Sequence, residues 1–486
     1  MKIKFIALFI MVYALVLHPA HAQERAQELH LEDVLKSSNA HYPKIKAAIA
    51  KQDAAAAKSQ EAQGAFDLRL DGDAKLRASG YYDGDYAGGQ LVKPIAPFNG
   101  ELYTGYRNGR GDFPIYDDEL RTKNGGKVNV GAIFSLLRNR EIDDRRFKFQ
   151  DAGFEQNLAD VDLMLTRLST QMKAQHSYAE WMAAGCILKV YDDLLTLAQE
   201  RQQNLMSRIK AGDASQIMAT ENEQNLVKRK AMLNEAKRDF IKRSNELSLF
   251  WRDDAGNPQV PTQKHLPKSF PKISTPDEYV VEADISKVIE TRPEIKSLQV
   301  NIEQQNNRVR LGENSLLPKL DLGFEVARHQ GNGLSRLDGT EAIGLIKFSI
   351  PLQRNLGEGQ TAAAKAQVRR LENDQRLTTD TIRTELRNLA TDLKMNSENL
   401  KLSDQEVSLA EKMQRAERQL LANGSSNLFL VNSREEKTAE ARVKNVLSNM
   451  YVFKAQGSYN AATMKFDKLA IAEVASDDNQ KPELQE

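Results

Sequence analysis

Two very long stretches without proline, 154–250 and 361–456, constrain the fold of this 486-residue chain more than any other feature. Hydrophobic residues recur in both at steps of three and four, as at Leu158, Val161, Leu165, Leu168 and Met172, and again at Ile382, Leu386, Leu389 and Leu393. This spacing is typical of a heptad seam. Uncapped helical periodicity of this length predicts long coiled-coil helices rather than globular packing.

Each stretch is interrupted once, and the two interruptions resemble each other. Both are short runs of glycine and polar residues, namely Gly212, Asp213 and Ser215 in the first and Gly424, Ser426 and Asn427 in the second. Glycine can end a helix in the left-handed region, and Ser215 or Asn427 can cap the helix that follows. We therefore predict a tight turn between two antiparallel helices at each interruption.

The resemblance between the two halves extends to an internal repeat. Segment 42–46 matches segment 292–296, and a helix-like run, a pair of alternating segments and a helical hairpin follow each. The predicted parts are a first repeat at 23–250 (strand pair 66–136, hairpin 142–250), a proline-rich connector at 251–290, a second repeat at 291–466 (strand pair 318–352, hairpin 357–466) and a polar tail at 467–486. Extra residues between Arg77 and Lys127 of the first copy are interpreted as a loop rich in Gly, Asp, Asn and Tyr.

The four alternating segments have one apolar face and one charged face. The residues expected to face lipid are Phe66, Leu68, Val130, Phe134, Leu322, Phe324, Ile346 and Phe348. A small soluble sheet covering a core is the alternative, but the flanking coiled coils offer no obvious core. About ten alternating residues is the length of an outer-membrane barrel strand, and four strands cannot close a barrel alone. We therefore expect an oligomer, with twelve strands from three chains favoured over sixteen from four.

Residues 1–22 have a basic start, an apolar run and the small-residue ending Ala20-His21-Ala22, as in a secretory signal peptide. The 68 Lys and Arg residues almost balance the 67 Asp and Glu residues, which argues against a nucleic-acid binder. The single cysteine, Cys186, excludes an internal disulfide framework and a multi-cysteine metal site. No catalytic motif is found, so we expect neither an enzyme, nor a cofactor, nor a metal site.

Two copies of helix, strand pair and helical hairpin behind a signal peptide resemble the TolC-like outer-membrane efflux proteins (outer membrane factors). The matching helix starts, the glycine turns and the segment 134–144, which leads from strand to helix, carry the resemblance. It implies a mainly α fold with a β-barrel, in which a homotrimer forms a 12-stranded barrel in the outer membrane and an α-helical periplasmic tunnel. It also implies a periplasmic adaptor and an inner-membrane transporter as partners, in tripartite efflux or type I secretion, with passive conduction.

By the same resemblance, the two glycine turns form the periplasmic aperture where the adaptor docks. The family often places acidic residues just past the second turn, but this chain has Leu430 and Ser433 there. Glu221 and Glu223, past the first turn, are the alternative source of pore charge. A periplasmic coiled-coil adaptor or a surface fibre without a pore remains the competing interpretation, and drugs, metal ions and secreted proteins all remain open as cargo.

Overall fold

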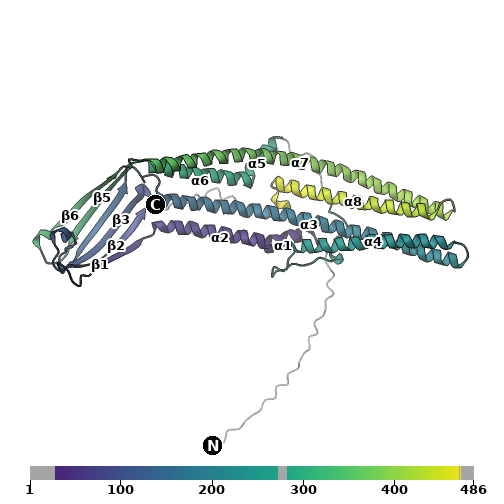
Figure 1. Cartoon of the computed structure of the whole chain (residues 1–486), viewed down its shortest axis with the longest axis horizontal. Coiled ribbons are helices and arrows are strands. Elements are labelled where there is room, and N and C mark those ends of the chain that lie inside the picture. The colour runs from purple at the N-terminus through teal and green to yellow at the C-terminus, as the bar shows by residue number, and fades with distance from the viewer. Residues whose placement is uncertain (1–27, 272–281, 470, 472–486) are drawn as a thin grey trace, which may run out of the picture.

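The computed structural model describes residues 28–271, 282–469 and 471. They form an elongated molecule with a β-sheet at one end and helices along the rest of its length (Figure 1). The predicted signal peptide at 1–22 and most of the predicted tail lie outside the described residues. The first part of that tail packs, because Phe466–Leu469 form a 3-10 helix and Leu469 is fully buried.

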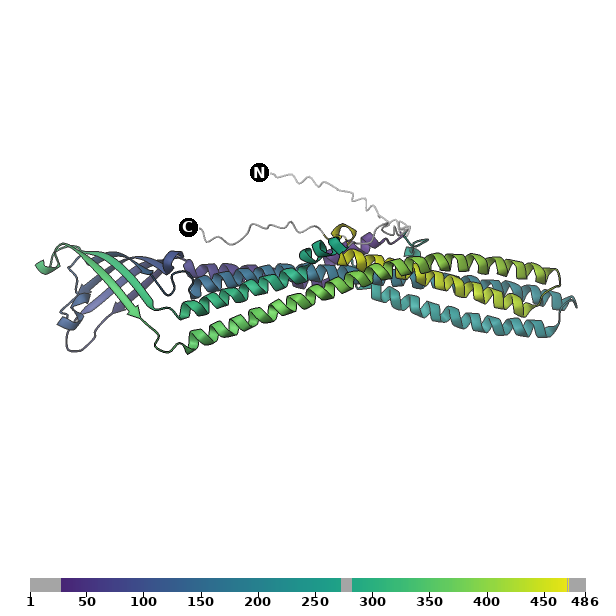
Figure 2. The same ribbon diagram turned by 90° about the horizontal axis from the view of Figure 1, so that it is seen from above.

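The order of elements in the first half recurs in the second. The helices of the first half are α1 (Leu31–His41), α2 (Pro43–Gln63), α3 (Asp144–Lys210) and α4 (Gln216–Ser248), and those of the second are α5 (Glu282–Thr291), α6 (Pro293–Ser315), α7 (Asn355–Ala422) and α8 (Leu428–Ala462). The long helices α3 and α7 each run from the sheet to the far end, as predicted (Figure 1). Beside α3 lie α2 and then α4, and beside α7 lie α6 and then α8 (Figure 2).

Local sequence explains where these helices begin. Pro43 and Pro293 occupy the first turns of α2 and α6, where their fixed φ suits a helix and the missing N–H is not needed. Asp143 caps α3, because its carboxylate accepts hydrogen bonds from the backbone N–H groups of Arg145 (2.8 Å) and Arg146 (3.2 Å). With 67 residues, α3 spans on the order of 100 Å at 1.5 Å per residue.

The sheet differs from the prediction, because each chain contributes six strands rather than four. The strands are β1 (Arg69–Lys75), β2 (Asp85–Ile95), β3 (Gly100–Arg110), β4 (Lys127–Ser135), β5 (Lys319–His329) and β6 (Thr340–Ser349). They are antiparallel and lie side by side in sequence order. The segment interpreted as a loop contains the β2–β3 hairpin, so the prediction of four strands per chain is wrong. Its glycines and polar residues, which are uncommon in strands, concealed the alternation.

The start of the first predicted strand also needs correction. Phe66 belongs to the 3-10 helix Gly64–Phe66, and its ring packs edge-on against Phe149 of α3, with 6.4 Å between ring centroids. Phe66 therefore packs against a helix instead of lying on the sheet. Leu68 precedes β1 by one residue and is 61% exposed.

The main hydrophobic core lies at the middle of the molecule, where α1, α3, α4 and α8 meet. Its centre holds Trp181, Met182 and Tyr178 of α3, Leu35 of α1 and Leu247 of α4, all fully buried or nearly so. The predicted seam of α7 is also buried at Ile382, Leu386 and Leu393. The described part of the proline-rich connector covers this core, since Leu266 packs directly against Gly185.

Candidate functional site

Both helical turns lie at the end of the molecule farthest from the sheet, and they are built alike (Figure 1). Gly212 has φ +77° and Gly424 has φ +75°, in the left-handed region that favours glycine. In the first turn, the N–H of Gly212 donates to the carbonyl of Ile209 (3.0 Å) and the N–H of Asp213 to that of Arg208 (2.9 Å). The second turn repeats both bonds, which is the Schellman ending of a helix.

The polar residues of the turns act differently in the two copies. Asn427 caps α8 as predicted, because its side-chain oxygen accepts a hydrogen bond from the N–H of Leu430 (3.0 Å). Ser215 occupies the same position before α4, but its side chain forms no capping hydrogen bond there, so this part of the prediction is wrong. Asp213 pairs with Arg208 (2.8 Å), and the hydroxyl of Ser426 donates to the carboxylate of Glu417.

Each turn is followed by an exposed hydrophobic side chain, five residues after the glycine. Ile217 is 71% exposed and Phe429 is 67% exposed, although both lie in the first turn of a helix. Glu221 is half-buried and Glu223 is exposed on α4. The far end of the molecule therefore presents two apolar side chains and nearby carboxylates to its surroundings.

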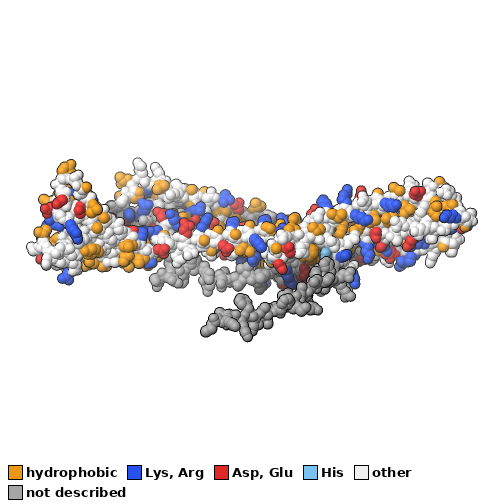
Figure 3. Space-filling view, turned by 90° about the horizontal axis from the view of Figure 1, so that it is seen from below, with side chains coloured by type: hydrophobic (Ala, Val, Ile, Leu, Met, Phe, Trp, Pro, Cys, Tyr) orange, Lys and Arg blue, Asp and Glu red, His pale blue; other side chains and the backbone are white. Residues whose placement is uncertain are grey.

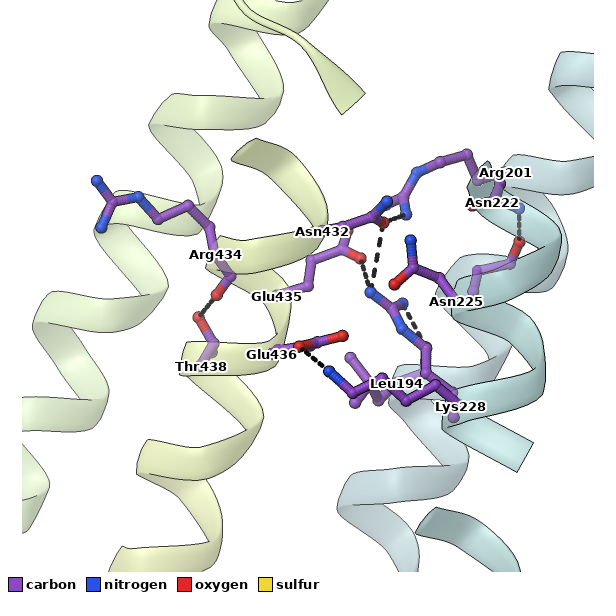
Figure 4. A network of polar contacts seen from close by, with 12 residues as sticks. Leu194, Arg201, Asn222, Asn225, Lys228, Asn432, Arg434, Glu435, Glu436 and Thr438 are labelled. Carbon is purple, nitrogen blue, oxygen red and sulfur yellow. Dashed lines mark hydrogen bonds and ion pairs between the residues drawn. The ribbon is translucent and has the colours of Figure 1, made fainter. Parts of the chain in front are cut away.

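One buried carboxylate near this end links four helices, and the sequence analysis did not identify it. The side chain of Glu435 on α8 is fully buried and accepts hydrogen bonds from Arg201 of α3, Arg229 of α4 (3.0 Å) and Arg418 of α7 (2.8 Å). Figure 4 shows Glu435 and Asn432 on the side of α8 that faces Arg201 of the other hairpin. Asn432 accepts a further bond from Arg201 (2.5 Å). Because the arginines come from both hairpins, this cluster holds the α3–α4 hairpin against the α7–α8 hairpin.

The charges of this cluster are set by its neighbours. Burial alone would raise the pKa of Glu435, but Arg201 and Arg229 outweigh burial and lower that pKa below its usual range. Burial lowers the pKa of Arg229, and Glu435 offsets part of this effect. Since a guanidinium stays protonated in proteins, one carboxylate faces three cations at neutral pH. Next to it, Lys228 pairs with Glu436 (2.7 Å).

At the opposite end, the register of the sheet separates two faces. The face that we call the apolar face carries hydrophobic side chains from all six strands, namely Leu70, Leu91, Leu102, Val130, Phe134, Leu322, Phe324, Val326, Ile346 and Phe348. Val130 lies opposite Val326, Phe134 opposite Leu322, and Leu322 opposite Ile346. Hydrophobic side chains gather over this end of the molecule (Figure 3). The register thus places on one face all six strand residues expected to contact lipid, and the contact itself stays a prediction.

The other face, which we call the polar face, is a connected layer of polar side chains. The carboxylate of Glu325 on β5 accepts hydrogen bonds from Tyr103 of β3 (3.0 Å) and Asn129 of β4 (3.2 Å). Lys127 lies 3.8 Å from Glu325 and 3.0 Å from Glu341 on β6. The polar face therefore suits contact with water, whereas the apolar face does not.

No group of three or more His, Cys, Asp or Glu side chains among the described residues is placed to hold a metal ion. None of the described helices has the length and apolar character needed to cross a membrane.

Comparisons with known proteins identify a shared fold. No protein-family model matches the chain, and no curated protein sequence matches it either. Solved structures match over nearly the whole chain, among them a membrane protein from Pseudomonas aeruginosa at 13% identity and TM-score 0.62, covering 90% of this chain and 95% of that one. The Campylobacter jejuni outer membrane channel CmeC matches at 14% identity and TM-score 0.61, covering 89% and 85%. The outer membrane protein VceC from Vibrio cholerae matches at 14% identity and TM-score 0.60, covering 89% of this chain and 95% of that one.

Proposed function

We propose, taking as premise that the chain has the TolC-like fold of outer-membrane channels, that it forms the outer-membrane channel of a tripartite efflux or type I secretion system. In this proposal a signal peptide at 1–22 directs export, and three chains assemble. Their sheets cross the outer membrane and their helices form a periplasmic tunnel. The repeats at 23–250 and 291–466 are the two structural halves of each subunit.

One observation carries the proposal: a sheet with one apolar face and one polar face stands at the end of helices on the order of 100 Å long. Exposed apolar side chains on this sheet include Val130 (59%), Phe324 (60%) and Ile346 (71%). Contiguous apolar surface of this kind marks a site for lipid or for another protein. Lipid fits best, because apolar-out and polar-in alternation is the pattern of strands that separate a bilayer from water.

Exposed side chains on α7 support assembly with further copies. Met395, Leu402, Leu409, Met413 and Leu420 follow one another at heptad steps, and each is at least 42% exposed. Leu402, Leu409 and Met413 line a groove between α7 and α8. A heptad seam left open in one chain suits a helix of a neighbouring chain, as the walls of a trimeric tunnel require.

The tunnel's far end supplies the aperture in this proposal. The two glycine turns would contact the hairpins of a periplasmic adaptor, with Ile217 and Phe429 as apolar anchors and Asp213, Ser426 and Asn427 as polar contacts. Glu221 and Glu223 would supply negative charge near the mouth. An inner-membrane transporter would drive export, and this chain would conduct cargo passively along the polar face.

The test is the location and mass of the native complex. We expect the protein in the outer-membrane fraction, extracted only by detergent, with a detergent-corrected light-scattering mass of three chains. A water-soluble monomer or dimer in the periplasm would contradict the channel and favour a coiled-coil adaptor. A soluble high-mass polymer would favour a surface fibre.

A further inference from the structure

The two outermost strands of the sheet are open edges. β1 and β6 each have one neighbour in the sheet, and every residue of both strands is exposed. Their outer N–H and C=O groups therefore have no partner strand in the described chain. In lipid, where water cannot satisfy these groups, an open edge is costly and must be closed by another strand.

The unexpected β2–β3 hairpin belongs to the wall of the sheet. On the apolar face it exposes Leu91 (41%) and Leu102 (44%), in line with the neighbouring strands. On the polar face Tyr103 crosses over β4, since a Cβ at Gly131 would lie 2.3 Å from its ring, and its hydroxyl bonds to Glu325 on β5. A hairpin folded away from the wall could not make this contact across β4.

The two edges complement each other in direction and charge. β1 leads away from the helices and β6 leads back into α7, so the edges of two neighbouring copies would meet antiparallel. On the polar face β1 carries Asp71, which pairs with Arg69 of the same strand (3.0 Å), and Asp73. On that face β6 carries Glu341, which pairs with Lys127, and Lys347, which forms no ion pair within the described part of the chain.

One register satisfies both faces of this junction. With Asp71 opposite Lys347, Asp73 lies diagonal to the same lysine, within reach of a long side chain. The same register places the small Gly72 of β1 opposite the large Ile346 of β6 on the apolar face.

We propose that β1 of one copy pairs antiparallel with β6 of the next, with Asp71 opposite Lys347, and that three copies close an eighteen-stranded barrel. This inference rests on the trimer of the proposed function. Because barrel diameter grows roughly linearly with strand number, the barrel is about 1.5 times as wide as a twelve-stranded one. Barrels of this size enclose an aqueous channel, so selection among solutes falls to the helical end rather than to the barrel.

Paired cysteines test the junction in the full chain, with Cys186→Ala removing the native thiol. We expect Asp71→Cys with Lys347→Cys to yield a covalent trimer on mild oxidation in outer membranes. The matched control, Asp71→Cys with Glu341→Cys, moves the second thiol six residues, about 20 Å, along β6 and should yield no cross-link. Covalent closure at two chains, or equal cross-linking in the control, overturns the proposal.

A second pair tests whether the hairpin lies in the wall. Asp71→Cys and Asn129→Cys are separated by two strands here, about 14 Å, and should not cross-link within a chain. In a twelve-stranded barrel β1 would pair directly with β4, and this pair would cross-link efficiently. A detergent-extracted trimer with that cross-link, or with no cross-link between Asp71→Cys and Lys347→Cys, overturns the eighteen-stranded barrel and leaves the channel standing. Absence of a membrane trimer overturns the channel itself.

Discussion

At the scale of single residues, Glu435 shows how a charge can hold two coiled-coil hairpins together. Breaking a buried ion pair by removing one partner costs several kcal/mol, because the charge left behind loses its compensation. Without Glu435, three guanidinium groups from α3, α4 and α7 would face one another with no buried carboxylate between them. The cluster therefore resists separation of the hairpins near the proposed aperture.

Sequence reasoning did not single out this cluster, because charged residues along long helices are most simply interpreted as solvated faces and inter-helix pairs. The signal was present, since Glu435 follows Leu428 and Val431 at heptad steps, and all three are buried. Arg229 likewise precedes Leu233 and Ala236 on the buried seam of α4. A charge at a seam position predicts a buried partner, but the identity of that partner depends on how two distant hairpins pack.

Glu435→Gln should loosen the far end of the molecule. The amide keeps the shape but removes the charge that balances the arginines, so we expect a loss of about 3–5 kcal/mol in local stability. Hydrogen exchange in 428–440 and 222–236 should become faster, whereas Glu440→Gln, an exposed change on the same helix, should leave it unchanged. Equal protection in the wild type and Glu435→Gln would show that the cluster does not hold the hairpins.

The same residue predicts a pH dependence. Because the pKa of Glu435 is lowered in the folded chain, its carboxylate contributes its full stabilisation above the pKa of glutamate in an unfolded chain, about 4.3. This stabilisation is lost as pH falls through the lower pKa of Glu435 in the folded chain. The protection of residues 428–440 from hydrogen exchange should therefore persist at pH 5 and decline only below about pH 4. This decline should be absent in Glu435→Gln.

At the scale of elements, the helices were predictable and part of the sheet was not. Long proline-free periodicity and two glycine turns were enough to predict α3, α4, α7 and α8. Four strands followed from alternation, but β2 and β3 contain Gly88, Gly89 and Gly105, which interrupt any hydrophobic pattern. Those glycines have a packing role that only the sheet reveals, since a Cβ at Gly105 would lie 2.7 Å from the side chain of Asn129.

Gly424→Val should disrupt the second turn without breaking the assembly. A β-branched residue at φ +75° is strained by about 1–3 kcal/mol, whereas nothing within 4 Å would obstruct its Cβ. We expect faster hydrogen exchange in 418–430, loss of export when the variant replaces the wild type in cells, and an unchanged trimer mass. Gly212→Val should behave in the same way.

Gly424→Asn is the matched control, because asparagine tolerates the left-handed region. It should retain export and an unchanged turn. If cells carrying either valine variant export normally despite a loosened turn, the assignment of the turns to adaptor docking is wrong.

At the scale of the whole molecule, opposite ends carry different chemistry. The sheet end has an apolar face and a polar face, and the helical end has two glycine turns above a buried charge cluster. The hydrophobic core between them, around Trp181, joins the two hairpins to α1 and the connector. Alternation in the sequence was sufficient to place six of the eight named residues on one face of the sheet, but it included Phe66, which packs against α3. It could not predict the number of strands, because the glycines of β2 and β3 conceal the alternation of those two strands.

The proposed orientation of the sheet in the membrane yields a whole-molecule prediction. Phe348 is 64% exposed on the apolar face, and Leu345 lies on the polar face of the same strand. Phe348→Arg should place a charge against lipid at up to about 2–4 kcal/mol, which falls toward the membrane interface. Leu345→Arg should place the same charge in water at little cost. We therefore expect less folded trimer in the outer membrane for Phe348→Arg than for Leu345→Arg, measured by detergent extraction and heat-modifiable gel mobility. The reverse order would mean that the polar face meets lipid, and equal recovery would mean that this end of the sheet lies outside the bilayer.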